Sequence, residues 1–138
     1  MNKWLQGLLF GIVILANIIL LYVLFLYFIQ GNTPGTYADH PMKACVVNDS
    51  VIVTIEYCRY NPMPFTHYAS FVNGIVFNLP PEEIVGTKTG CGIIKRSYVI
   101  PHEVPAGEYY INARSEFKVN ALKTVSIGFV TERFNITR

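Results

Sequence analysis

The sequence predicts one N-terminal transmembrane helix followed by an all-β antiparallel sandwich of about seven strands. Residues 8–29 are apolar or aromatic at every position except Asn17. Beyond residue 43, short segments alternate apolar and polar residues with a period of two, as half-buried strands do. Turn-forming residues separate these segments, and no second helix is indicated.

The apolar segment 8–29 has the length of a membrane span. At ~1.5 Å per residue it would extend about 33 Å as a helix, enough to cross a hydrocarbon core of ~30 Å. A cleaved signal peptide has a shorter apolar core and a small-x-small cleavage site, and a soluble core helix shows a polar stripe. Type IV pilins are processed after a glycine that precedes a glutamate at a fixed spacing. At that spacing Gly7 is followed by Ile12 and Gly11 by Ala16, so neither glycine matches the pilin pattern. We therefore expect an uncleaved anchor.

The charges that flank this segment predict its orientation. Lys3 is the only charged residue before position 31, and the next basic residue is Lys43. The positive-inside rule therefore predicts a single-pass inner-membrane protein with a cytoplasmic N-terminus and a periplasmic C-terminal domain. We expect residues 1–30 to be a cytoplasmic stub and the transmembrane helix, 31–42 a linker rich in Pro and Gly, and 43–138 the β-sandwich ectodomain.

Alternation defines the expected strands. In segment 51–59 the inward face would carry Val51, Val53, Ile55 and Tyr57. Segment 108–119 would point Tyr109, Ile111, Ala113, Phe117 and Val119 inward. Asn73-Gly74 between two apolar runs is a strong hairpin signal. Near the C-terminus, Phe134 and Ile136 have the opposite parity to Val125, Ile127 and Phe129, which predicts a β-bulge near residues 131–133.

One corner resembles immunoglobulin-like and fibronectin type III domains. The residues Pro105-Ala106-Gly107 precede Tyr109 and Tyr110, much as a turn precedes the corner tyrosine at the start of the sixth strand in those domains. The resemblance implies that one of the two tyrosine hydroxyls bonds back across the corner. No Trp lies in the ectodomain, so an antibody-type core is not expected.

The chain contains three cysteines, Cys45, Cys58 and Cys91. Cys58 ends one expected strand and Cys91 begins another. Because the second and fifth strands of an immunoglobulin-like sandwich are antiparallel neighbours, we predict a Cys58–Cys91 disulfide, which requires an oxidising compartment. Cys45 is expected to be a buried thiol, with an intermolecular disulfide as the alternative. In a reducing cytoplasm all three would be free.

The sequence offers little for catalysis or cofactor binding. Its histidines are His40, His67 and His102, and its only aspartates are Asp39, in the linker, and Asp49, in a turn. The aspartate of a Ser-His-Asp site would therefore have to come from the linker or from a turn. The spacings CxxC, HxH and HExxH of metal sites, and the Gly-Lys-Ser/Thr ending of a phosphate-binding loop, are missing from the sequence. Beyond Lys3 there are ten basic and nine acidic residues, and they do not form the basic stripe of a nucleic-acid-binding surface. We therefore expect no catalytic residue, no metal, no other cofactor, no nucleic acid, and no enzyme.

Two sets of residues are candidates for contacts with other chains. Within the helix, Gly7 and Gly11 form a GxxxG and Asn17 places an amide in the membrane. Either feature could pack against another helix, including one of a homo-oligomer, although the two lie on different faces. In the ectodomain we expect partner contacts in segments 60–67 and 80–90, because exposed Pro, Met and aromatic residues suit protein surfaces. These contact candidates are Tyr60, Pro62, Met63, Phe65, Pro80, Pro81 and Glu82. The alternative for Tyr60 and Phe65 is that they cover the edge of the core.

Several ectodomain motifs together resemble a known group of proteins. In order, they are Cys58-Arg59-Tyr60, a hairpin before Pro80, Thr89-Gly90-Cys91, and the Pro-x-Gly-x-Tyr corner that ends at Tyr109. This order resembles small single-pass membrane proteins encoded by tailed bacteriophages and prophages of Gram-negative hosts. The resemblance implies phage origin and periplasmic exposure, and it supports the pairing of Cys58 with Cys91. It implies no settled activity, so it assigns no functional residue.

The expected function is that of a protein-binding or structural module. The lipid bilayer would hold the β-sandwich beside an unidentified protein of the envelope or of a virion. The alternative is an envelope-acting enzyme or a factor accessory to lysis or superinfection. The lipobox and the coiled coil of lysis spanins are both missing from the sequence.

Overall fold

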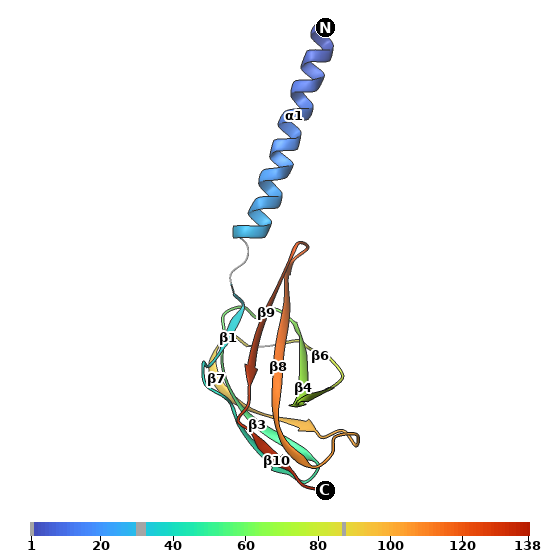
Figure 1. Cartoon of the computed structure of the whole chain (residues 1–138). Helices are drawn as coiled ribbons and strands as arrows, with labels where there is room; N and C mark the ends of the chain where they lie inside the picture. The colour runs from blue at the N-terminus through green and yellow to red at the C-terminus, as the bar shows by residue number, and fades with distance from the viewer. Residues whose placement is uncertain (1, 30–32, 87) are drawn as a thin grey trace. The chain divides into compact units, whose positions relative to one another are not determined.

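The computed structural model describes residues 2–29, 33–86 and 88–138. Helix α1 covers Lys3–Leu24 and continues as a π-helical turn, η1, over Phe25–Ile29 (Figure 1). No residue of α1 is buried, and the stretch Lys3–Phe28 is long and apolar enough to cross a membrane. It is the one candidate span within the described residues. The expected N-terminal apolar helix is therefore confirmed.

Ten strands make up the β domain of the described chain. They are β1 (Gly35–Tyr37), β2 (Lys43–Val47), β3 (Ser50–Arg59), β4 (Phe65–Asn73), β5 (Ile75–Asn78), β6 (Glu82–Ile84), β7 (Gly90–Val99), β8 (Gly107–Asn120), β9 (Lys123–Val130) and β10 (Phe134–Ile136). About seven were expected. The short strands β1, β6 and β10 have three residues each, too few for a period of two to be recognised in the sequence.

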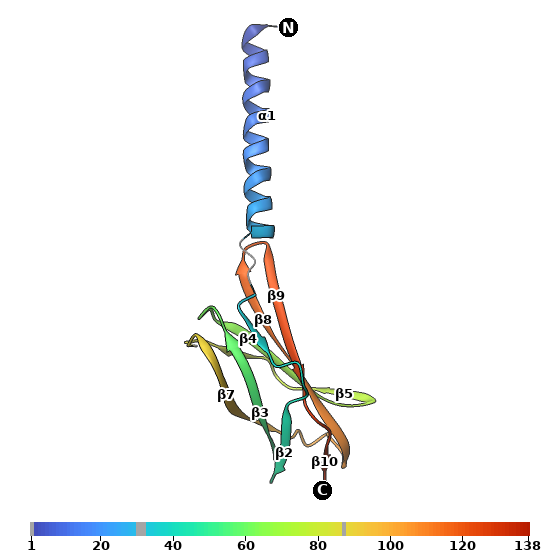
Figure 2. The ribbon, with the colours of Figure 1, turned by 90° about the vertical axis from the view of Figure 1, so that its left-hand side faces the viewer.

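The strands form two sheets that face each other, with β7, β3 and β2 in one layer and β8, β9 and β5 in the other (Figure 2). In the first sheet, β3 pairs along its whole length with β7, and its other edge pairs with β1 and β2 one after the other. In the second sheet, β4 lies between β8 and the short strands β5 and β6, while the far edge of β8 pairs with β10 and β9. The domain is therefore mostly antiparallel, as expected.

The core lies between the sheets and follows the predicted alternation. Val51 and Val53 on β3, and Ile111 and Tyr109 on β8, are almost completely buried, whereas their polar neighbours face outward. Asn73-Gly74 connects β4 to β5 as predicted. Gly74 has a φ of 66°, a left-handed conformation that glycine adopts without steric strain.

The segment expected to be a linker is partly structured. Its residues Gly35–Tyr37 form β1, which pairs with the end of β3. Met42 is fully buried, and its backbone bonds to Val130 and Glu132 in a parallel bridge. Proline and glycine disfavour regular structure, but pairing with an existing strand edge supplies the hydrogen bonds that local preference does not. Part of the expected linker is therefore hydrogen-bonded to the β domain.

Two further expectations differ from the structure. The expected bulge near residues 131–133 is a break between β9 and β10. There the Thr131 hydroxyl accepts a hydrogen bond from the Ile111 N–H at 2.9 Å. The next residue, Glu132, donates its backbone N–H to the carbonyl of Met42. Cys45, expected to be buried, is exposed, because Ala44 and Val46 occupy the inward positions of the edge strand β2.

Candidate functional site

A cavity of about 280 Å³ opens between the two sheets. Five strands and the loop after β6 line it, and apolar side chains form most of its wall. The lining residues are Tyr37, Ile55, Tyr57, Arg59, Phe65, His67, Ile84, Lys88, Ile94 and Arg96. Ligand sites in proteins are concave and mostly apolar with a few converging polar groups. This cavity is the candidate functional site.

Arg59 is the last residue of β3 and has the inward parity of Val51, Val53 and Ile55, so its side chain enters the interior. Only 7% of its surface is exposed, and its guanidinium lies 4.3 Å from the ring centre of Phe65 and 5.1 Å from that of Phe117. Burial lowers the pKa of Arg59 below its ordinary value. Aromatic faces partly compensate a desolvated cation, but they accept no conventional hydrogen bond.

Gly35 allows the chain to cover Arg59. A side chain at position 35 would place its Cβ 2.7 Å from the carbonyl oxygen of Cys58 and 3.7 Å from Nε of Arg59. The close approach of β1 to β3 therefore requires glycine.

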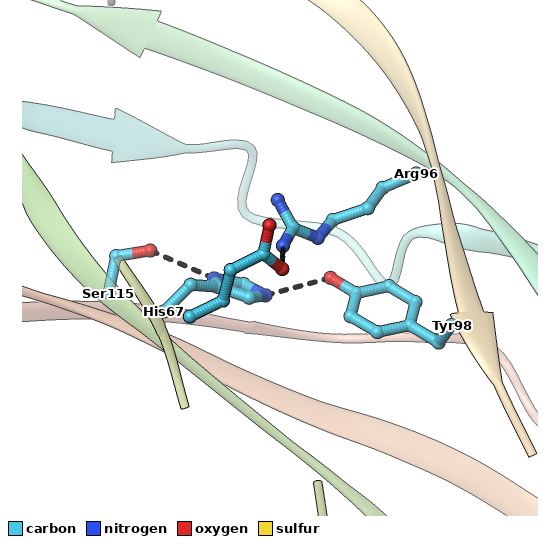
Figure 3. Close-up of polar contacts among 5 residues, drawn as sticks. His67, Arg96, Tyr98 and Ser115 are labelled. Atoms are coloured by element: carbon cyan, nitrogen blue, oxygen red, sulfur yellow. Dashed lines mark hydrogen bonds and ion pairs between the residues drawn. The ribbon is translucent and has the colours of Figure 1, made fainter. Parts of the chain in front are cut away.

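A buried chain of hydrogen bonds crosses the interior beside this cavity (Figure 3). The two ring nitrogens of His67 contact the Ser115 hydroxyl at 3.2 Å and the Tyr98 hydroxyl at 2.9 Å. The Ser115 hydroxyl is also 2.7 Å from the hydroxyl of Tyr37. His67, Ser115 and Tyr98 are all buried. Every polar group of this chain therefore has a partner, which offsets the free-energy penalty of burying it.

The protonation of His67 follows from its surroundings. Burial and, second, the nearby charge of Arg96 lower its pKa to about 4. The imidazole is therefore neutral at neutral pH, with one nitrogen donating and the other accepting. Burial also raises the pKa of Tyr98, which keeps its hydroxyl protonated as a donor. Arg96 forms an ion pair with Glu82 and lies over the Tyr98 ring at 5.6 Å.

The structure brings the two predicted contact segments together. Strands β4 and β6 pair with Phe65 opposite Ile84 and His67 opposite Glu82, so segments 60–67 and 80–90 are neighbours beside the cavity. Tyr60, Pro62, Pro80, Pro81 and Glu82 are exposed, and Met63 is half-buried. Phe65 follows the stated alternative, because its side chain is buried at the edge of the core with its ring centre 4.9 Å from that of Phe117.

The cysteines and the helix residues occupy defined places. Cys58 and Cys91 lie opposite each other in the β3–β7 ladder and form a disulfide next to Arg59. The side-chain amide of Asn17 donates to the carbonyl of Val13 on its own helix at 2.8 Å. Gly7 and Gly11 lie on α1, and each has open space where a side chain would be.

The buried polar residues of the site were not singled out from the sequence. The signal was present, since Arg59, His67 and Ser115 each occupy an inward position of a strand whose other inward residues are apolar. A polar residue at such a position is buried and needs a partner or a role.

Comparisons with known proteins give little further information. No protein-family model and no curated protein matches the chain. A solved structure of Pseudomonas fluorescens alkylpurine DNA glycosylase AlkC bound to DNA containing an abasic site analog is similar at 12% identity and a TM-score of 0.34. The match covers 79% of this chain and 33% of that one, so this chain spans about a third of that protein's length.

This match corrects one expectation. We expected the protein not to be an enzyme, and a solved structure to which it is similar is that of an enzyme, so the expectation is withdrawn. At this TM-score the likeness carries no argument for a glycosylase activity or for a shared fold.

Proposed function

We propose that this protein is a membrane-tethered recognition module whose β domain binds another protein outside the cytoplasm. The N-terminal candidate span supports a tether. The Cys58–Cys91 disulfide supports an oxidising compartment, since structural disulfides persist there and are rare in the cytosol. Lys3, on the N-terminal side of the span, supports a cytoplasmic N-terminus and a periplasmic β domain.

We further propose that the β domain is immunoglobulin-like. In an immunoglobulin-like sandwich the first, second and fifth strands lie in one sheet, and the third, sixth and seventh lie in the other. The pairing of β3 with β2 and β7, and of β8 with β4 and β9, supports this arrangement. Tyr109 is buried at the start of β8 against Phe77. Neither Tyr109 nor Tyr110 makes a hydroxyl hydrogen bond to the described residues, so the strand pairing carries this proposal and the tyrosine corner does not.

The observation that carries the protein-binding proposal is the pairing of β4 with β6. It brings the two predicted segments, 60–67 and 80–90, together, with Phe65 opposite Ile84 and His67 opposite Glu82. Tyr60 and Val85 are exposed there by 62% and 69%. Exposed proline, aromatic and aliphatic side chains suit a protein partner better than water.

Site-specific photocrosslinking tests this surface. A photoreactive amino acid placed at Tyr60 or at Val85 of the full-length protein in its native membrane is expected to capture the same partner. The matched control is Val76 on β5, which is also exposed but lies outside both segments. Capture of that partner equally well from Val76, or no capture from either Tyr60 or Val85, would contradict the proposed surface.

The cellular setting has its own tests. A reporter enzyme that folds only in the periplasm, fused after Arg138, should be active if the domain is exported. The resemblance to phage-encoded membrane proteins leads us to propose a phage or prophage origin. Mass spectrometry of purified virions beside infected-cell membranes then separates a virion protein from one confined to the envelope.

A further inference from the structure

Arg59 contains a buried polar atom whose presence the fold alone does not explain. Its Nη1 is the one buried side-chain nitrogen or oxygen within the described residues that has no hydrogen-bond partner. A buried donor left unpaired destabilises the fold, and more so when the group is charged. An arginine with a purely structural role would reach a carbonyl or a carboxylate.

Among the described residues that line the cavity with Arg59, none is acidic. Glu82, on the neighbouring strand β6, is paired with Arg96. Lys88 adds a further cation to the cavity lining, while Ile55, Ile84 and Ile94 make its walls apolar. The cavity therefore combines a buried positive charge with an apolar wall.

We propose that this cavity binds a small organic acid, with the carboxylate on Arg59 and an apolar body against the isoleucines. A carboxylate beside the guanidinium would supply the counter-charge that the residues lining the cavity lack. The volume of about 280 Å³ is at the lower end for ligand pockets and limits the acid to a small one. This site and the surface for a protein partner are independent proposals.

Fluorine NMR with two matched probes tests the proposal. The full-length protein in zwitterionic lipid nanodiscs is titrated with para-fluorophenylacetate and, separately, with the uncharged para-fluorophenylacetamide, with empty discs as the blank. Both probes have nearly the same shape, so the comparison isolates the charge. The acid is expected to bind at least about tenfold more tightly than the amide, as one charge-assisted hydrogen bond to a buried cation implies.

Variants then assign the effect to Arg59. Arg59→Met keeps an unbranched side chain but removes the charge, and it should abolish the preference for the acid. Arg133→Met is the matched control, because Arg133 is an exposed arginine paired with Glu108. It should bind both probes as the wild type does.

A second variant covers the case in which Arg59→Met does not fold. Ile94→Trp keeps Arg59 and fills the cavity from β7, so it should also remove binding of the acid. Equal binding of acid and amide to the wild type, no binding of the acid, or unchanged acid binding in the folded variants would each overturn the proposal.

Discussion

The two ends of the β-domain interior are built differently. At one end Val51, Phe71 and Tyr109 pack with other apolar side chains, and each is no more than 2% exposed. At the other end Arg59 and His67 are buried beside a cavity. Apolar packing stabilises a fold without help from a ligand, whereas a buried cation with a free donor does not. The first end therefore supplies the stability, and the second end has the features of a site.

The largest expected effect tests the apolar end. Phe71 is fully buried and packs edge-on against Phe134. Phe71→Ala should lower the free energy of unfolding by about 3–5 kcal/mol, because it removes apolar contacts and leaves a cavity. Urea unfolding of the full-length protein in detergent micelles, followed by circular dichroism, measures the change.

The control for this change is Ile75→Ala on the neighbouring strand β5. Ile75 is 66% exposed, so its replacement should alter stability by less than about 0.5 kcal/mol. Similar losses in the two variants would show that stability is not concentrated at the apolar end.

The second prediction concerns the disulfide, which closes the β3–β7 ladder at the cavity end. Replacing both Cys58 and Cys91 by alanine should destabilise the domain by about 3–4 kcal/mol, from the lost restriction of an unfolded loop with a sequence separation of 33. Cys45→Ala serves as the comparison, because that thiol is exposed and free. A reducing agent should shift the unfolding transition of the wild type but leave that of the double variant unchanged. A wild type that ignores the reducing agent would contradict this prediction.

The third prediction is a pH dependence from His67. Its pKa is about 4 in the folded domain, against ~6.5 in an unfolded chain. The unfolded state binds the proton more tightly, so the stability that neutral His67 contributes is present above pH ~6.5 and is lost as the pH falls toward about 4. Urea unfolding at pH ~6.5 and at pH ~4 should show a loss of about 2–3 kcal/mol in the free energy of unfolding.

A variant separates His67 from other titrating groups. His67→Gln retains a hydrogen-bonding side chain without a titrating ring, so its unfolding free energy should fall less between neutral and acidic pH. His102→Gln is the control because His102 is exposed. His40, whose pKa is raised chiefly by a hydrogen bond with the Pro41 backbone and also by Glu56, remains in both variants and cancels in the comparison. Equal pH profiles in the two variants would contradict the assignment.

The apolar end could be predicted from the sequence, and the cavity end only in part. Alternation correctly placed the inward residues of β3 and β8, because burial of one face of a strand imposes a period of two. Alternation does not specify what an inward polar residue contacts. The partners of His67 lie 31 and 48 residues away in the chain, and only the assembled sheets bring them together.

The errors have a common physical origin. Segment 33–42 contains the short strand β1 and the buried Met42, and both depend on pairing with distant strands. The exposure of Cys45 depends on which edge strand it occupies and which face of that strand points inward. Local preference is a weak guide where long-range pairing decides the outcome.

The smallest expected effect is the most informative about the cavity end. In the absence of ligand, Arg59→Met removes an unpaired buried charge, which favours the variant, and two cation–π contacts, which favour the wild type. The penalty for the unpaired charged donor is at least about 1–3 kcal/mol, and desolvated cation–π contacts contribute about 1–2 kcal/mol. Because the terms nearly offset, the change in unfolding free energy should lie between a loss of about 1 kcal/mol and a gain of about 2 kcal/mol. A loss comparable to that of Phe71→Ala would mean that Arg59 serves the core, and the contrast between the two ends would fail.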